Sequence, residues 1–176
     1  MLTETAPGLA RLLPGASFPD LELPDHTGYV WRLSDLVGED PTFVNFFRGW
    51  WCPKEQGFFR RLITLQDEAE VAYTRIVSVS VDPPETLAAF RAGLGARWTF
   101  LSDAGRRHIE GLGLREATDT LNNPYLPALF SLLPDLTIHA AYNGYWFWGR
   151  PTNEEIRQDF RAMSRAVRPD WDPPAP

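Results

Sequence analysis

Cysteine is nearly absent from this sequence: among 176 residues it occurs once, at Cys52. A single cysteine excludes an internal disulfide, so any thiol chemistry must end on a partner protein or a small molecule, and a reducing compartment suits such a chain. No run of about 18 apolar residues occurs, and the N-terminus lacks a basic start followed by an apolar stretch. We therefore expect a cytoplasmic protein that neither spans a membrane nor binds to one.

The sequence also has few basic residues relative to acidic ones, and it lacks the residue spacings typical of metal sites. The 17 basic side chains are outnumbered by 23 acidic ones, giving a net charge of -6, which disfavours nucleic acid as a partner. The three histidines, His26, His108 and His139, lack the close spacing of metal ligands, so we expect no metal site. A phosphate loop, a GxGxxG fingerprint and a GxSxG elbow are missing, and no cofactor is expected.

The residues that are present predict an α/β fold. The apolar run from Thr42 to Phe47 indicates a buried strand, a helical spacing follows from Lys54, and residues 75–82 form a β-branched strand. Strand, helix and strand within about 40 residues make a βαβ unit, which is parallel and right-handed. Ahead of it, residues 21–33 flank a DHTG turn and predict a short hairpin.

The pattern continues to the last helix. We expect a helix over PPETLAAFRAGLG, a strand at WTFLSD, a helical turn or two over 106–112, a loop over 115–125, and two antiparallel strands around Pro134-Asp135. A capping box of Thr152 and Glu155 starts a final helix over 153–167. Proline and glycine are frequent at the N-terminal end and proline at the C-terminal end, so we divide the chain into an irregular segment 1–17, a domain 18–167 and an irregular tail 168–176.

Cys52 lies where chemistry is usual in such folds. Ligands gather outside the carboxyl ends of parallel strands, which here is the turn RGWWCP. A thiol at a helix start faces free backbone N–H groups, which favour an accessible thiolate, and Arg48 and Lys54 act in the same direction. Glu55 opposes them if ionised, or accepts the thiol proton if burial raises its pKa. The alternative is a cysteine buried as a small hydrophobe.

A second cluster, YNGYWFWGR at 142–150, is rich in aromatic side chains. The last strand runs antiparallel to the one that begins near Pro127, so its far end lies beside the start of that strand. If Pro127 lies next to the cysteine turn, rings from both segments wall an apolar substrate pocket over Cys52. These rings are Trp50, Trp51, Tyr145, Trp146, Phe147 and Trp148. The alternatives are core packing or a contact in a homodimer.

From Phe18 to Val167 the chain resembles the thioredoxin-like superfamily, most closely the redoxin branch with the alkyl hydroperoxide reductase and thiol-specific antioxidant (peroxiredoxin) family. The resemblance rests on the opening hairpin, the SVD and FLSD strand ends, the final hairpin and helix, and Trp51-Cys52-Pro53. It implies a three-layer sandwich, with a mixed central sheet, helices on both faces and an N-terminal hairpin extension.

The family's catalytic motif departs from this sequence. The peroxiredoxin turn Pro-x-x-x-Thr-x-x-Cys falls on Arg48, Cys52 and Glu55, so glutamate stands where the peroxidatic cysteine is expected. The family arginine before the later strand falls on Pro127, where thioredoxins have a proline that is usually cis. Against the thioredoxin motif WCxxC, Glu55 replaces the resolving cysteine. The site resembles half of a dithiol centre.

The resemblance implies a thiol redox protein with Cys52 as nucleophile and Arg48 and Glu55 beside it. Peroxide would oxidise Cys52 to sulfenic acid, and an external small-molecule thiol would recycle it. A mixed disulfide with a partner protein is a further expectation. The alternative is a non-catalytic redoxin that binds an apolar ligand or a protein through its aromatic loop, and a structural dimerisation module stays open as a third hypothesis.

Overall fold

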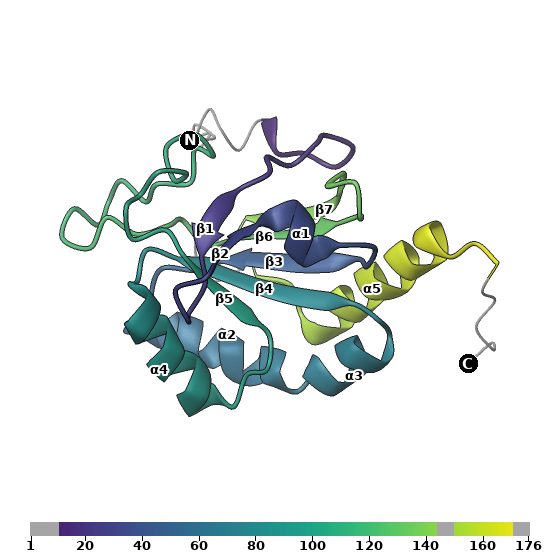
Figure 1. Ribbon diagram of the computed structural model, residues 1–176, viewed down its shortest axis with the longest axis horizontal. Helices are drawn as coiled ribbons and strands as arrows, with labels where there is room; N and C mark the ends of the chain where they lie inside the picture. Colours follow the sequence, from purple (N-terminus) through teal and green to yellow (C-terminus); the bar gives the residue numbers. More distant parts are fainter. Residues whose placement is uncertain (1–10, 144–149, 171–176) are drawn as a thin grey trace, which may run out of the picture.

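A mixed five-stranded sheet forms the centre of the computed structural model, which describes residues 11–143 and 150–170 (Figure 1). The strand order is β5-β4-β3-β6-β7. β3, β4 and β5 are parallel, whereas β6 and β7 run antiparallel to their neighbours. The bounds are β3 Thr42–Phe46, β4 Arg75–Ser80, β5 Thr99–Ser102, β6 Ala128–Leu132 and β7 Ile138–Asn143.

Helices and a hairpin cover the two faces of this sheet. The helices are α1 Leu33–Val37, α2 Pro53–Ile63, α3 Gln66–Val71, α4 Pro84–Leu94 and α5 Asn153–Val167. The hairpin consists of β1 Glu22–Pro24 and β2 Val30–Arg32, which pair antiparallel. In Figure 1, α2, α3 and α4 lie on one side of the sheet, and α1 and the hairpin lie on the other. The thioredoxin-like three-layer prediction is therefore confirmed.

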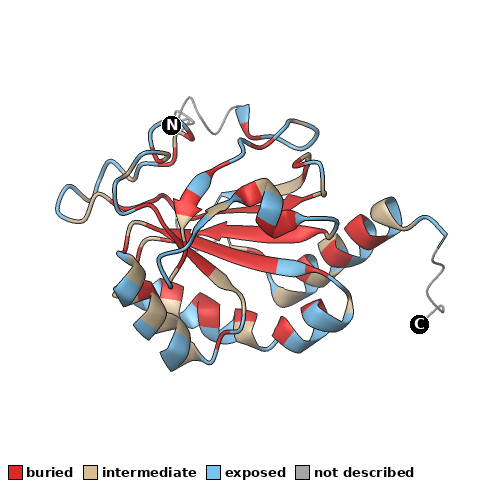
Figure 2. Ribbon diagram, in the orientation of Figure 1, coloured by how far each residue is buried: buried red, intermediate tan, exposed pale blue. Residues whose placement is uncertain are grey.

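The alternation of side chains along β3 explains why both faces are covered. Phe43 packs against α2 and α5, and Phe47, just past the strand, packs against α2 and α4. Val44 and Phe46 point to the opposite face and join the core under α1 and the hairpin. A strand buried on both faces reads as a continuous apolar run, as this one does, and Figure 2 shows the central strands mostly in the colour of buried residues.

Two predicted helices differ from the structure. The helical pattern after Cys52 breaks at Thr64, where the hydroxyl donates to the carbonyl of Arg61 at 2.7 Å and the chain leaves α2 before α3 begins. A threonine hydroxyl that bonds the preceding turn competes with the helical ladder. Residues 107–113 form consecutive turns with one helix-like hydrogen bond, from the N–H of Leu112 to the carbonyl of His108, and Arg106 ahead of them has a φ of +52°, outside the helical region.

The last helix follows its sequence signals closely. Thr152 caps α5, its side chain accepts the N–H of Glu155, and the Glu155 carboxylate accepts the N–H of Thr152 at 2.6 Å. Ile156, Phe160 and Met163 of this helix are buried against the sheet. Within residues 11–143 and 150–170, no helix has both the length and the apolar content needed to cross a membrane. The division into segments 1–17, 18–167 and 168–176 stays a prediction.

Candidate functional site

The turn between β3 and α2 is built around Gly49. Its φ is +155°, and a Cβ atom at this position would lie 2.5 Å from Nε1 of Trp51, so a larger residue cannot be placed without moving that ring. The N–H of Trp50 donates to Oδ2 of Asp82 at 3.1 Å, which fastens the turn to the end of β4. Burial raises the pKa of the Asp82 carboxyl, and its hydrogen bonds with Ser80 and Trp50 oppose this.

Cys52 is the N-cap residue of α2, and Pro53 is the first residue of the helix. The side chain is 2% exposed and makes no capping hydrogen bond, so the backbone donors of the helix do not hold the sulfur. Instead Nη1 of Arg48 lies 3.9 Å from Sγ. The expected accessibility of the thiol is thus wrong, because Cys52 packs into the turn, although its nearest polar contact is a cation.

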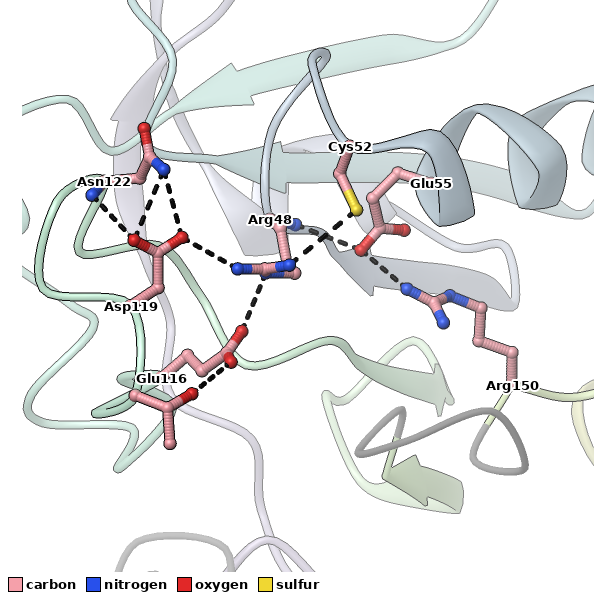
Figure 3. A network of polar contacts seen from close by, with 8 residues as sticks. Arg48, Cys52, Glu55, Glu116, Asp119, Asn122 and Arg150 are labelled. Atoms are coloured by element: carbon pink, nitrogen blue, oxygen red, sulfur yellow. Dashed lines mark hydrogen bonds and ion pairs between the residues drawn. The ribbon is translucent and has the colours of Figure 1, made fainter.

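Arg48 points inward and is held from three sides. Its Nε lies 2.7 Å from Oε2 of Glu116 and its Nη2 lies 2.8 Å from Oδ2 of Asp119. The guanidinium also lies over the ring of Trp51, 5.0 Å from the centroid. Figure 3 shows the guanidinium between the two carboxylates on one side and the Cys52 sulfur on the other. A positive charge is therefore fixed beside the sulfur.

Glu55 lies one turn into α2 and is 1% exposed. Its Oε1 accepts a hydrogen bond from Nη2 of Arg150 at 2.7 Å and another from the backbone N–H of Arg48 at 3.2 Å. Burial raises the pKa of the Glu55 carboxyl, and the charge and hydrogen bond of Arg150 oppose the rise. A carboxylate with a raised pKa is a stronger base than an ordinary one.

Pro127 is brought to this turn by strand pairing. Phe46 at the end of β3 pairs with Ala128 at the start of β6, so buried Pro127 lies next to the residues that lead into the cysteine turn. No cis peptide bond occurs among the described residues, and the bond before Pro127 is trans. Tyr145, Trp146 and Trp148 lie outside the described residues, so the aromatic pocket over Cys52 stays a prediction.

Trp50 and Trp51 separate on the two sides of the turn. Trp51 is half-buried under Arg48, whereas Trp50 is 48% exposed and borders a groove of about 780 Å³ between α2 and α4. Cys52 does not line this groove, which therefore lies off the thiol. Its walls are Trp50, Gln56, Arg60, Ile63, Glu85, Thr86, Ala89, Phe90, Gly93 and Leu94. Among the described residues, no group of histidine, cysteine and acidic side chains could hold a metal ion.

Sequence reasoning missed the acidic and basic partners of the site. Asp119 lies 71 residues after Arg48, and Arg150 lies 95 residues after Glu55. Neither pair shares an element or a local period that could have linked it. The acidic content of the loop 115–125 was the one available signal, but a loop of this kind is usually solvated.

Comparison with known proteins supports the same fold. A family model described as the AhpC/TSA family matches residues 14–141. A protein of Mycobacterium tuberculosis that is named as a peroxiredoxin is 37% identical over 93 residues, which cover 51% of this chain and 58% of the relative. The match thus spans a little over half the length of that relative.

Solved structures give the same result at lower identity. Peroxidoxin BcpB from Mycobacterium tuberculosis superposes with a TM-score of 0.75 at 23% identity, over 89% of this chain and 99% of the other. AhpC from Enterococcus faecalis gives a TM-score of 0.72 at 17% identity, over 92% of this chain and 99% of the other. At these identities the likeness concerns the fold alone.

Proposed function

Because the chain belongs to the AhpC/TSA family, we propose that it is a thiol-dependent peroxidase with Cys52 as its nucleophile. The observation that carries the proposal is the 3.9 Å contact between Nη1 of Arg48 and Sγ of Cys52. A guanidinium stabilises a thiolate, and it can also donate a hydrogen bond to a peroxide oxygen.

The proposed reaction consumes one peroxide and two external thiols. The Cys52 thiolate attacks the terminal oxygen of the peroxide, the S–O bond forms, and the O–O bond breaks. Sulfur is oxidised to sulfenic acid, and the leaving oxygen takes up a proton and departs as an alcohol or water. One external thiol then displaces water from the sulfenic acid to form a mixed disulfide, and a second releases Cys52.

We assign Glu55 the role of proton acceptor for the Cys52 thiol. It lies on the same helical turn and its pKa is raised by burial, which makes the carboxylate a stronger base. The thiol proton can pass from this carboxyl to the leaving oxygen. Cys52 is 2% exposed, so a small peroxide needs less opening of the turn than a protein disulfide does. We therefore rank small peroxides ahead of protein partners as substrates.

Peroxide consumption with a small-molecule thiol as reductant tests the proposal. The wild-type chain should consume peroxide, and Cys52→Ser should be inactive because no other cysteine exists. A sulfenic acid trap should add its mass at Cys52 after one equivalent of peroxide. Arg48→Ala should lower the rate about tenfold or more, in line with loss of a cation beside a thiolate. Equal rates for wild type and Cys52→Ser would reject the proposal.

The burial of Cys52 favours a second candidate, a non-catalytic redoxin that binds an apolar ligand or a protein through the aromatic loop. Binding of an apolar fluorescent probe tests it. Under this hypothesis Cys52→Ala leaves probe binding intact, and Trp148→Ala weakens it. Binding that depends on Cys52 and ignores Trp148 counts against it.

The cellular setting follows from the same chemistry. A single cysteine that needs an external thiol is best supplied in the cytoplasm, and we propose that location, with a peroxide and a small-molecule thiol as partners. A homodimer is a separate proposal. Analytical ultracentrifugation of the full chain, reduced and peroxide-treated, measures it, and a monomer in both states would refute it.

A further inference from the structure

We infer that Glu116 and Asp119 are positioning residues for Cys52, and that they act by holding the Arg48 guanidinium against the sulfur. The inference rests on the proposed function. The two carboxylates lie 2.7 and 2.8 Å from different nitrogens of Arg48, whereas the sulfur lies 3.9 Å from a third nitrogen. The shortest contacts of Arg48 are therefore with the loop 115–125. These contacts fix the position of the guanidinium, and that position brings it beside Cys52.

Arg48 needs such support because an arginine side chain is long and flexible. Ordering it costs about 2 kcal/mol of rotamer entropy, and a hydrogen bond to sulfur at 3.9 Å does not offset that cost by itself. Its side chain is 23% exposed, so a path to solvent is open. The charge-assisted hydrogen bond to Asp119, the ion pair with Glu116 and the Trp51 ring remove this freedom.

The two acidic residues have hydrogen-bond partners of their own in the loop, besides Arg48. Both Asp119 oxygens accept hydrogen bonds from Asn122, from its backbone N–H at 3.0 Å and from its side-chain amide. Thr118 donates to Oε1 of Glu116 at 2.7 Å, and the N–H of Glu116 donates to the carbonyl of Pro124. The loop thus presents two carboxylates, each held by other residues of the loop, to the guanidinium (Figure 3).

The same carboxylates also oppose a thiolate through their charge. Around the sulfur stand Arg48 from its own turn, Glu116 and Asp119 from the loop, Glu55 from α2, and Arg150 ahead of α5. Figure 3 shows the two loop carboxylates beyond the guanidinium as seen from Cys52. Because the Coulomb interaction falls with distance, each of these carboxylates acts on the sulfur more weakly than the nearer guanidinium does.

The test is the pH midpoint of Cys52 alkylation. Truncation by Glu116→Ala with Asp119→Ala should raise the midpoint by about one pH unit, as should Arg48→Ala, because both remove the cation from the sulfur. The triple variant should be no higher than Arg48→Ala alone, since the carboxylates act through Arg48. Glu116→Gln with Asp119→Asn keeps acceptors for Arg48, so its midpoint should not rise above wild type.

A matched control is Glu110→Ala, which removes an acid that pairs with Arg115, and its midpoint should stay at the wild-type value. Circular dichroism of each variant checks that the fold is retained. Additive shifts in the triple variant, an unchanged midpoint, or a lower midpoint after truncation would each overturn the inference. These shifts are differences between variants, so they can be read even if wild type is inactive with peroxide, the result that rejects the proposed function.

Discussion

Nη2 of Arg150 donates a 2.7 Å hydrogen bond to Oε1 of Glu55, and the two side chains are 9% and 1% exposed. Arg150 lies just ahead of α5 and Glu55 lies in the first turn of α2. Their ion pair therefore connects these two segments beside the cysteine turn. Two charges removed from water are costly, and they are tolerated here because each neutralises the other and the Arg48 N–H adds a third contact. Loss of either partner leaves a buried charge unpaired.

Arg150→Ala should therefore destabilise the chain most at alkaline pH. The pKa of Glu55 is already raised above 4.5 by burial, and removal of Arg150 raises it further. Between 4.5 and its folded pKa, the carboxyl binds more protons folded than unfolded, so stability falls as pH rises through this window. We expect a loss of about 3 kcal/mol near pH 8 and less near pH 5 in urea unfolding. Adding Glu55→Gln should abolish the extra pH dependence, and a loss equal at both pH values would contradict this account.

Gly49→Ala should disrupt the turn before Cys52. A Cβ atom here meets Nε1 of Trp51 at 2.5 Å in a backbone conformation that other residues rarely adopt, so we expect a loss of about 1–3 kcal/mol and altered tryptophan fluorescence. Gly57→Ala is the matched control, because Gly57 lies inside α2 with open space around it. It should stabilise the chain by about 0.5–1 kcal/mol. Two variants with the same sign of effect would show the turn argument to be wrong.

Asp82→Ala should destabilise the same turn, because Asp82 holds the turn to the end of β4. It leaves the Trp50 N–H and the Ser80 hydroxyl without their acceptor, at a cost of about 1–3 kcal/mol in thermal or urea unfolding. Asp82→Asn keeps one oxygen acceptor and should recover most of that stability. Equal losses for the two substitutions would mean that the hydrogen bonds to Asp82 are not what the turn depends on.

Thr152→Ala should weaken the start of α5 by about 1 kcal/mol, because the hydroxyl accepts the N–H of Glu155. Thr152→Ser preserves the oxygen and should cost little. Hydrogen exchange of the first-turn amides is the direct measurement, and it should speed up in the alanine variant alone. Unchanged exchange at these amides would show that the cap does not stabilise the helix.

Local signals carried the fold prediction a long way. The two-residue alternation of strands and the 3.6-residue repeat of helices are properties of neighbouring residues, so the βαβ unit, the closing strands and the capped final helix were all found where the sequence placed them. The helix break at Thr64 was not predicted. It depends on a hydrogen bond from the Thr64 hydroxyl to a backbone carbonyl, and the spacing of apolar residues carries no information about such a bond.

The sequence by itself determined that a lone cysteine stands at the start of the first crossover helix, with arginine and glutamate in reach. Tertiary structure decided the rest: that Arg48 turns inward, that Glu116 and Asp119 receive it, and that Arg150 neutralises Glu55. These partners lie far along the chain, 71 residues from Arg48 to Asp119 and 95 from Glu55 to Arg150, and side-chain direction is set by packing between distant segments. The burial of Cys52 has the same origin, because solvent exposure is a property of the assembled turn and loop.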